Sequence, residues 1–412
     1  MAMIKPFKAV RPAEDLAEKI AALPYDVYNR EEAKEEITRE PHSFLKIDRA
    51  ETNFPEHVST YDTAVYEKAK DLLEDMLING EFVTEGEECF YIYELIMEGR
   101  SQTGLVACAS IDDYISGVIK RHENTRTDKE LDRINHIDIC NAQTGPIFLT
   151  YRGSDRVKEL IDRKKQIEKL YGFTSSDGIT HNIWKLDREI EVNCIKEEFE
   201  QISAVYIADG HHRAASAVKV GLKRREEQQG YTGKEEFNFF LSVLFPAEEL
   251  LIMPYNRVIK DLNGYTEEEF LKKVAEYFTL EELGSNAYAP KEKGEYGMYL
   301  ENKWYKLIIS KENRKDNDPV AGLDVSLLQD NLLENILGIK DPRSDKRIDF
   351  VGGIRGLDEL ERRVAEDMSV AFSLYPTSIK ELMDVSDAGE LMPPKSTWFE
   401  PKLRSGLFLH KI

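Results

Sequence analysis

Cysteine is scarce in this sequence, and long apolar runs are absent. Only 4 of the 412 residues are cysteine, and they stand far apart without a C-x-x-C pair. This spacing argues against a disulfide framework and against a thiolate zinc site. No segment approaches the roughly 20 apolar residues of a membrane span, and the N-terminus holds too short an apolar run for a signal peptide. We therefore expect a cytoplasmic protein with reduced thiols and no membrane segment.

Basic residues are also fewer than acidic residues. The chain has 56 Lys and Arg residues against 77 Asp and Glu residues, which gives a net charge of −21. Because affinity for a polyphosphate backbone depends on Lys and Arg, we expect neither general nucleic-acid binding nor binding to anionic membranes. A hydrophobic content of 41% with only 24 Gly and 15 Pro is typical of a folded globular chain.

The order of apolar and polar residues predicts a mixed α/β fold. Residues 89–97 and 102–111 are rich in β-forming residues around a polar turn, which predicts a hairpin. Residues 237–245 form an apolar run without charge, the pattern of a fully buried strand. Charged amphipathic segments between these runs predict helices.

The length suggests two or three domains, and the composition changes in the second half of the chain. Residues 281–315 are rich in Gly, Lys and Glu, which suggests a peripheral module or insertion. We predict a core domain of residues 1–258 and a smaller α+β domain of residues 259–412. We expect the second domain to pack on the same cleft, with its tail returning to the core.

The densest chemical signal is the segment A-D-G-H-H-R at residues 208–213. A probable strand runs into Asp209 and Gly210 and then into an Ala-rich helix. Gly210 can adopt an unusual backbone angle, and the amides that follow it point outward at a helix N-terminus, where phosphate groups bind. The carboxylate, the imidazoles of His211 and His212 and the guanidinium of Arg213 suit anion binding, proton transfer or metal ligation. The competing interpretation is structural, with Asp209 as a helix cap and the histidines as packing residues.

A second group of ionisable residues lies at K-R-H-E-N-T, residues 120–125. His122 and Glu123 could form a general acid/base pair, with Arg121 or Lys129 countering phosphate charge. The alternative is the solvated start of a charged helix.

Two further segments have both a functional and a structural interpretation. Asp26 follows a Pro turn, where it is either a ligand in a cleft or a local cap.

The segment 393–399 carries two prolines, a Trp and a Phe, and it fits neither a strand nor a helix. Folded back onto the core, it could present side chains to an anion, or it could simply seal apolar surface. Its candidate anion-binding residues are Lys395, Ser396 and Thr397. Basic residues thus gather near three motifs of an acidic chain, which predicts a small electropositive cleft formed by all three.

Through A-D-G-H-H-R the chain resembles a large bacterial and archaeal family of unknown function, whose core is similar to the ParB/sulfiredoxin fold. Four more segments look like the same family, so the resemblance covers essentially the whole chain. These are L-P-Y-D-V at 23–27, R-H-E-x-T at 121–125, G-P-I-F-L-T-Y at 145–151 and M-P-P-K-S-T-W-F at 392–399. A narrower similarity, limited to residues 209–213, links the chain to the archaeal free-serine kinases.

The resemblance implies a ParB/sulfiredoxin-like core that holds nucleotide phosphates on the turn at residues 209–213. Related kinases use an N-terminal glutamate as the base, for which Glu14 is the nearest analogue here, with Asp26 and Glu123 as rivals. The expected catalytic residues are Asp209, His211, Glu123, His122, Asp26 and Glu14, with Asp209 also as metal ligand. The expected cofactor-binding residues are Gly210, His211, His212, Arg213, Arg121, Lys129, Lys395, Ser396 and Thr397.

The sequence therefore predicts an enzyme, a nucleotide-dependent kinase that phosphorylates a small hydroxyl compound such as free L-serine. ATP or ADP would be the donor, and Mg²⁺ would neutralise developing phosphate charge. One alternative is a phosphatase or phosphodiesterase acting on a phosphomonoester such as phosphoserine, for which the two motifs would supply a mixed metal shell. Another is a nucleotide-gated regulatory protein without small-molecule turnover. The expected partners are a nucleotide and a small hydroxyl or phosphorylated metabolite, and a homodimer is left open.

Overall fold

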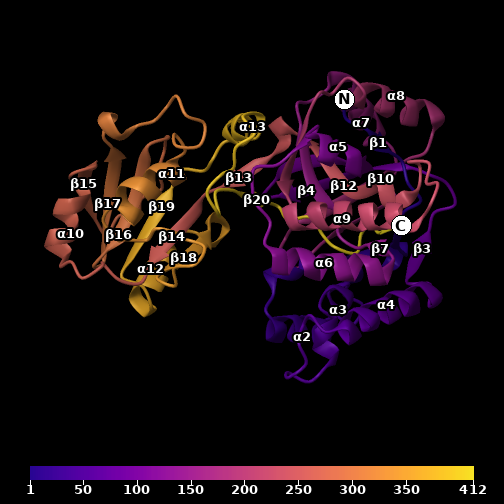
Figure 1. The fold of residues 1–412 in the computed structure, drawn as a ribbon, viewed down its shortest axis with the longest axis horizontal. Helices are drawn as coiled ribbons and strands as arrows, with labels where there is room; N and C mark the ends of the chain where they lie inside the picture. The colour runs from indigo at the N-terminus through magenta and orange to yellow at the C-terminus, as the bar shows by residue number, and fades with distance from the viewer. The chain divides into compact units, whose positions relative to one another are not determined.

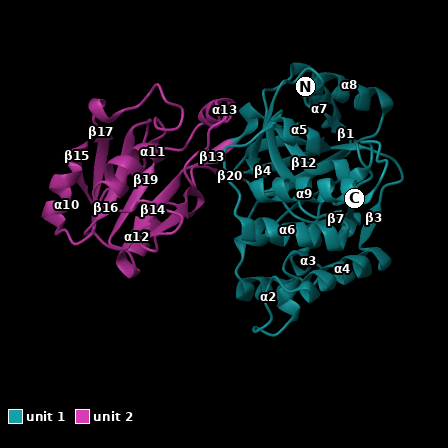
Figure 2. Cartoon of the chain, viewed as in Figure 1, with its two compact units in different colours: residues 1–250, 401–412 teal, residues 251–400 magenta.

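The computed structural model describes residues 1–412, which divide into two compact units. The first unit comprises residues 1–250 together with the C-terminal segment 401–412, and the second comprises residues 251–400 (Figure 2). The sequence had suggested a division after residue 258. Helix makes up 37% and strand 26% of the chain, which confirms the predicted mixed α/β class. None of the helices combines the length with the apolar composition that a membrane span requires.

The first unit is built on a nine-stranded mixed sheet in the order β6-β11-β8-β12-β5-β4-β10-β9, with β1 beside β5. Its strands are β1 (Ile4–Lys5), β4 (Phe90–Met97), β5 (Arg100–Ser110), β6 (Ile119–Lys120), β8 (Ile147–Tyr151), β9 (Tyr171–Thr174), β10 (Thr180–Leu186), β11 (Val205–Asp209) and β12 (Phe239–Pro246). The predicted hairpin is the antiparallel pair β4 and β5, and the predicted buried strand is β12 at the centre of the sheet. Both predictions are confirmed.

Helices cover the sheet of the first unit in successive layers. They are α1 (Ala17–Ile20), α2 (Arg30–Arg39), α3 (Leu45–Asp48), α4 (Thr63–Ile78), α5 (Ile111–Ser116), α6 (Thr127–Cys140), α7 (Asp155–Lys164), α8 (Glu189–Phe199) and α9 (His211–Glu227). In Figure 1, α9 lies on the sheet, α6 lies beside α9, and α3 and α4 follow beyond α6. The hydroxyl of Ser216 on α9 donates to the backbone carbonyl of Glu130 on α6 at 2.9 Å, which fixes the two helices to each other.

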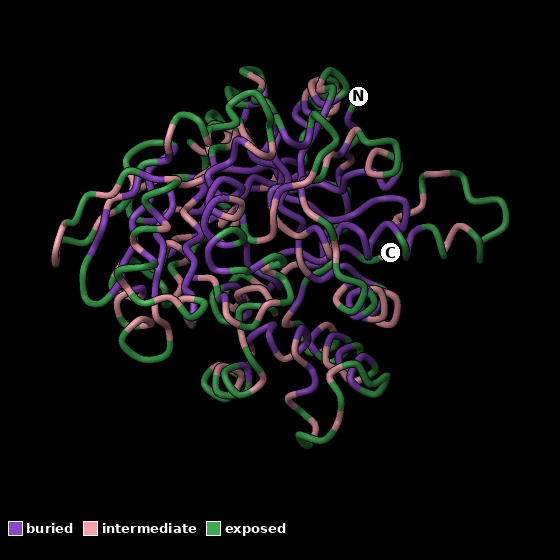
Figure 3. The backbone as a smooth tube through the Cα atoms, turned by 60° about the vertical axis from the view of Figure 1, so that its left-hand side comes forward, coloured by how far each residue is buried: buried purple, intermediate pink, exposed green.

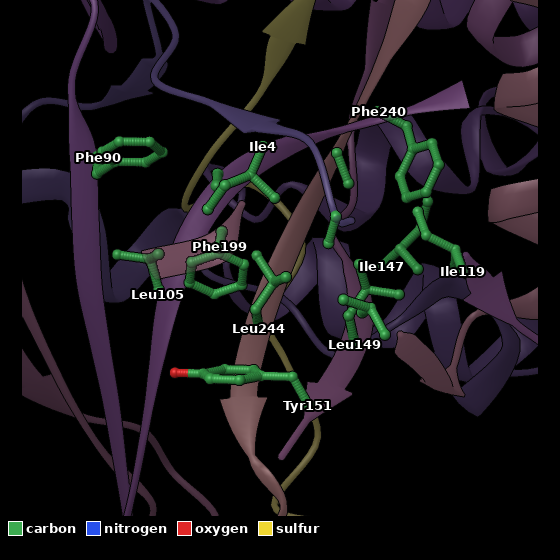
Figure 4. Packing of buried hydrophobic residues seen from close by; sticks show 14 of the residues in the cluster. Ile4, Phe90, Leu105, Ile119, Ile147, Leu149, Tyr151, Phe199, Phe240 and Leu244 are labelled. Atoms are coloured by element: carbon green, nitrogen blue, oxygen red, sulfur yellow. The ribbon is translucent and has the colours of Figure 1, made fainter. Parts of the chain in front are cut away.

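Apolar side chains from both faces of this sheet form the core. Leu149, Leu244 and Leu105 are fully buried between the sheet and its helices (Figure 4). The rings of Tyr151 on β8 and Phe199 on α8 pack at a centroid distance of 4.9 Å. In Figure 3 the buried stretches of the chain lie inside the fold, and many of the outlying loops are exposed. Burial of this apolar area is the main favourable contribution to folding.

The C-terminal segment 401–412 completes the first unit by pairing with three separate parts of it. Strand β21 (His410–Lys411) pairs with β7 (Ala142–Gln143). Single bridges join Leu409 to Val10 and Ser405 to Ala22. Two more short strands, β2 (Val10–Pro12) and β3 (Phe82–Thr84), form their own antiparallel pair. The segment therefore runs along the N-terminal part of the chain.

The second unit has a six-stranded antiparallel sheet in the order β15-β17-β16-β19-β14-β18, and β13 and β20 pair separately. Its elements are β13 (Leu251–Met253), β14 (Tyr255–Ile259), α10 (Glu267–Val274), β15 (Phe278–Gly284), β16 (Glu295–Leu300), β17 (Lys303–Ile309), α11 (Asp324–Leu328), β18 (Ile348–Gly352), α12 (Asp358–Glu366), β19 (Val370–Leu374), α13 (Ile379–Asp387) and β20 (Trp398–Glu400). Residues 281–315, for which the sequence suggested a peripheral module, lie within this unit and include β16 and β17 of its sheet. Strand β16 lies between β17 and β19, and all its residues are buried although Gly297 and Glu295 weaken its apolar pattern.

Gly104 provides a test of the packing at the centre of the first sheet. A Cβ atom at Gly104 would lie 2.7 Å from Val243 Cγ1 and 2.8 Å from Phe245 Cε1. We expect Gly104→Ala to lower the free energy of unfolding of the first unit by about 1–3 kcal/mol in urea denaturation. The matched control is Gly86→Ala, where a Cβ meets nothing within 4 Å. Equal stability of the two variants would contradict the described packing.

Candidate functional site

The segment A-D-G-H-H-R forms a sharp turn between β11 and α9. Gly210 has φ 91° and ψ 30°, a left-handed conformation that favours glycine. Its carbonyl accepts the N–H of Ala214 at 3.0 Å, which starts a helix of 17 residues. No side chain caps this helix. Asp209 therefore does not have the capping role that the structural interpretation assigned to it. The amides of the first turn are left for another acceptor.

Asp209 forms an ion pair with a lysine from the far end of the chain. Its Oδ2 lies 2.8 Å from Nζ of Lys402, and its Oδ1 accepts the backbone N–H of Gly210 at 2.7 Å. Desolvation opposes ionisation of the carboxyl, but Lys402, the Gly210 N–H and Arg213 outweigh it and hold the pKa of Asp209 well below its usual range. Asp209 is therefore ionised. Lys402 belongs to the site through this ion pair, which the sequence analysis did not predict.

The second motif reaches this turn because β6 lies beside β11. Ile119 pairs with Val205 and Lys120 with Tyr206 in parallel register, so the residues after each strand emerge at the same edge of the sheet. This edge brings His122 against His211, with ring centroids 4.5 Å apart and planes at 88°. The sequence prediction that the two motifs belong to one site agrees with this placement.

The two histidines are almost completely buried, with 2% of His122 and 5% of His211 exposed. Both ring nitrogens of His122 and Nε2 of His211 have no hydrogen-bond partner. Burial lowers the pKa of His122 to about 4, against the opposing charge of Asp209. Burial, with the neighbouring His122, also holds the pKa of His211 well below its ordinary value. Both imidazoles are therefore neutral at pH 7.

Glu123 adds a carboxylate to the histidine pair. Its Oε2 lies 3.9 Å from Nδ1 of His211, and 43% of its side chain is exposed. Single ligand atoms of His122, Glu123 and His211 all lie within 4.8 Å of one another, a group that could hold a metal ion. Two neutral imidazoles and one carboxylate suit a transition metal better than a hard cation such as Mg²⁺.

His212 points to a different neighbour from His211. Its Nε2 accepts the backbone N–H of Arg126 at 2.9 Å, just before α6 begins. Burial lowers the pKa of His212, and the charges of Asp26 and Glu130 act in the opposite direction. Asp26, exposed in the turn Tyr25–Val27, thus lies close enough to act on the same motif.

Tyr25 joins the P-Y-D turn to the site through two guanidinium groups. Arg133 Cζ lies 4.0 Å and Arg213 Cζ 5.7 Å from the centroid of the Tyr25 ring. Arg213 also donates to the carbonyl of Pro146 at 3.3 Å, and a Cβ on Gly145 would lie 2.9 Å from its Cζ. Tyr25 was not among the predicted site residues, although it stands in a motif that the sequence analysis quoted.

A small pocket of about 20 Å³ lies next to these groups, with room for about one water molecule. Its polar lining consists of Asp48, Arg133, His136, Gln143, Thr144 and Arg213. The cavity is too small for a nucleotide. We interpret it as part of the polar packing that supports Arg213, because Arg133 is itself paired with Asp132 at 2.8 Å.

The remaining predicted residues have other surroundings than the two histidines, although the charge of Arg121 acts on the pKa of His211. Glu14 is exposed in a short 3₁₀ helix and makes no hydrogen bond or ion pair, and Lys129 lies half-buried on α6. Arg121 is exposed and donates to the Tyr114 hydroxyl at 3.4 Å. Three residues belong to the second unit, so the single cleft formed by all three motifs stays a prediction. These are Lys395, Ser396 and Thr397.

The buried neutral histidines make stability depend on pH. In the unfolded chain His122 titrates near its ordinary pKa of about 6.5, whereas in the folded chain its pKa is about 4. The unfolded state therefore binds more protons between these values, so stability is present above pH 6.5 and falls as the pH drops towards 4. Between pH 7.5 and 5.5, with a chelator present, we expect His122 to account for a loss of about 1 kcal/mol in the free energy of unfolding.

Urea denaturation of the wild type and of His122→Gln at both pH values measures this contribution. The variant should be less stable at pH 7.5 but should lose about 1 kcal/mol less on acidification. An unchanged pH dependence would show that His122 is not buried in its neutral form.

Comparisons with solved structures found only distant similarity. A free serine kinase in complex with AMP is 14% identical and has a TM-score of 0.38, with 73% of this chain and 92% of that chain covered. SbnI with C-terminal truncation from Staphylococcus aureus is 10% identical, with a TM-score of 0.39 and coverage of 74% and 87%. A conserved hypothetical protein from Pyrococcus furiosus is 14% identical, with a TM-score of 0.36 and coverage of 76% and 97%. These similarities assign no activity to the chain.

A search of curated proteins found no match. The family model described as a protein of unknown function, DUF1015, matches residues 4–326. This range contains the P-Y-D turn, the R-H-E segment and the A-D-G-H-H-R turn, as the resemblance of the sequence predicted. The chain belongs to the DUF1015 family of proteins of unknown function.

Proposed function

We propose that the protein is a nucleotide-dependent phosphotransferase that phosphorylates the hydroxyl group of a small molecule. The observation that carries this proposal is the start of α9, a helix of 17 residues without a side-chain cap that follows a left-handed glycine. The free amides and the positive end of the helix dipole favour a phosphate group there. Arg213 and Lys402 add positive charge beside the same turn.

Positioning and charge stabilisation supply most of the catalysis in phosphoryl transfer. The amides of the first turn of α9 would hold the terminal phosphates of ATP or ADP. Lys402 lies beside the turn, paired with the carboxylate of Asp209 at 2.8 Å, and it would share its positive charge with a bound phosphate. The neutral imidazoles of His122 and His211 are buried beside the turn, and each can donate one hydrogen bond.

Asp209 fits poorly as a ligand for the magnesium ion that accompanies a nucleotide. One of its oxygens accepts the Gly210 N–H, and the other is paired with the ammonium group of Lys402, which would repel a cation. Magnesium prefers oxygen ligands and retains several water molecules. Any magnesium would therefore depend on the nucleotide phosphates for its ligands, and no step of the proposed reaction is assigned to it.

Asp26 is the carboxylate that we propose as the base. It is exposed, makes no hydrogen bond or ion pair, and its charge acts on the pKa of His212. A free carboxylate can take the proton of the acceptor hydroxyl while the hydroxyl oxygen attacks the terminal phosphorus atom and the nucleotide leaves with one phosphate fewer. The similarity of the A-D-G-H-H-R motif to the free-serine kinases makes L-serine the first acceptor to test.

Nucleotide binding at the turn is tested by Gly210→Ala. Alanine disfavours the left-handed backbone by roughly 1–2 kcal/mol, so the turn relaxes and its amides no longer converge. We expect ADP to raise the Tm of the wild type but not of this variant. Gly230→Ala is the matched control, because Gly230 has φ 82° in an exposed position with nothing within 4 Å. Equal stabilisation of both variants by ADP would place the nucleotide elsewhere.

Catalysis is tested by incubating the protein with L-serine and either ATP or ADP and by measuring O-phosphoserine. We expect Asp26→Asn to lower kcat by about 10²–10⁴-fold while nucleotide binding persists. Asp15→Asn, which changes an exposed carboxylate of the same N-terminal region, should leave kcat unchanged. Glu14→Gln measures the rival base directly.

Two other outcomes would contradict the kinase proposal, and a third would change only the assignment of the base. Hydrolysis of phosphoserine without any transfer would favour the phosphatase alternative. Stabilisation by nucleotide without turnover of any hydroxyl compound would favour the nucleotide-gated alternative. A full loss of kcat in Glu14→Gln, with Asp26→Asn unaffected, would reassign the base.

A further inference from the structure

The histidine pair leaves buried polar atoms without partners. Both ring nitrogens of His122 and Nε2 of His211 lack a hydrogen bond. A buried polar atom that stays unpaired costs about 1–3 kcal/mol, and such atoms in a folded protein call for an explanation such as an ion. The backbone of Ile207 lies close enough to act on the pKa of His122, but it does not reach hydrogen-bond geometry with either nitrogen.

The ligand atoms around this pair are suitably placed for one ion. Atoms of His122, Glu123 and His211 all lie within 4.8 Å of one another. A tetrahedral ion with bonds of about 2.0–2.2 Å holds its ligand atoms about 3.4 Å apart, so the three side chains need to converge only slightly. Side-chain rotation supplies this movement, because Glu123 is half-exposed and its carboxylate lies 3.9 Å from the nearer histidine nitrogen.

We propose that His122, Glu123 and His211 bind a divalent transition-metal ion of the zinc class and leave one coordination position open. Two histidines and one glutamate form an established ligand set for zinc, in which a water molecule or a substrate takes the fourth position. Both imidazoles are buried, and three of their four ring nitrogens have no hydrogen-bond partner, so lone pairs are left for an ion.

A negative charge close to the proposed ligands would favour a bound cation. The carboxylate of Asp209 acts on the pKa values of both His122 and His211, which places a negative charge next to their rings. Asp209 accepts hydrogen bonds from Gly210 and Lys402 and none from these rings, so it would favour a cation there through its charge. The Ile207 backbone is a candidate acceptor for the second nitrogen of His122 once a metal fixes the ring. The site differs from a magnesium site because two of its three ligands are nitrogen.

This inference does not depend on the proposed kinase reaction. The three ligands come from the start of α9 and from the residue pair after β6, and none requires a nucleotide. With Glu123 committed to the metal, Asp26 is the free carboxylate left to act as base. Because His211 is also the first residue of α9, an ion there would lie beside the turn and could bind a phosphate oxygen or a water molecule in its fourth position.

The test uses full-length protein that has been stripped of metal with a chelator and contains no nucleotide. Titration with Zn²⁺ by calorimetry should show one tight site per chain, and Co²⁺ should produce the visible absorption of a four-coordinate site. Glu123→Gln and His122→Gln should each weaken the binding of both ions by more than about tenfold, since even loss of a supporting outer residue costs 10–100-fold. His212→Gln should bind as the wild type does, because its Nε2 accepts a backbone N–H instead.

Folding and adventitious binding are controlled separately. Circular dichroism of the stripped variants shows whether they are folded, and Glu123→Gln keeps the size of a half-exposed side chain. His57→Gln removes an exposed histidine and should change nothing. The proposal is overturned if the wild type binds neither ion tightly, or if folded Glu123→Gln and His122→Gln retain wild-type affinity. Failure of ADP to bind would refute the kinase proposal and leave this result untouched.

Discussion

The left-handed backbone at Gly210 is the constraint on which the site depends. It allows the chain to leave β11 and enter α9 within one residue, so Asp209 stays at the end of the sheet while His211 turns inward. The same turn leaves the first amides of α9 without a side-chain cap. The parallel pairing of β6 with β11 then sets the second motif beside the first. Two short segments, far apart in the sequence, become one chemical group through these two backbone features.

The histidine pair is kept in a state that opposes stability, because three of its four ring nitrogens are buried without hydrogen bonds. Asp209 differs, because Lys402 and the Gly210 N–H hold its pKa well below its usual range and so favour its ionised form in the folded protein. Polar groups that cost stability tend to be retained where they bind or react. A phosphate on the helix end and a metal on the histidines would each satisfy groups that the chain itself leaves unsatisfied. One ion pair, between Asp209 and Lys402, ties the C-terminal segment 401–412 to this arrangement.

The sequence predicted the local features well and the distant ones poorly. The hairpin of β4 and β5 and the strand–turn–helix of A-D-G-H-H-R follow from patterns within a few residues, so they could be foreseen. The pairing of Asp209 with Lys402 joins residues 193 positions apart, and no local pattern reports such a contact. The packing of Tyr25 against two arginines likewise joins residues that are far apart in the sequence, so no local pattern predicts it. Strand β16 was not predicted, because glycine and glutamate weaken its apolar pattern.

Hydrogen–deuterium exchange with and without ADP tests the central claim most directly, because it reports which backbone amides the nucleotide covers. The account predicts that ADP slows exchange at the amides of residues 211–213, which have no partner within the first turn of α9. Protection confined to other parts of the chain, or no protection at saturating ADP, would contradict a phosphate site at this turn.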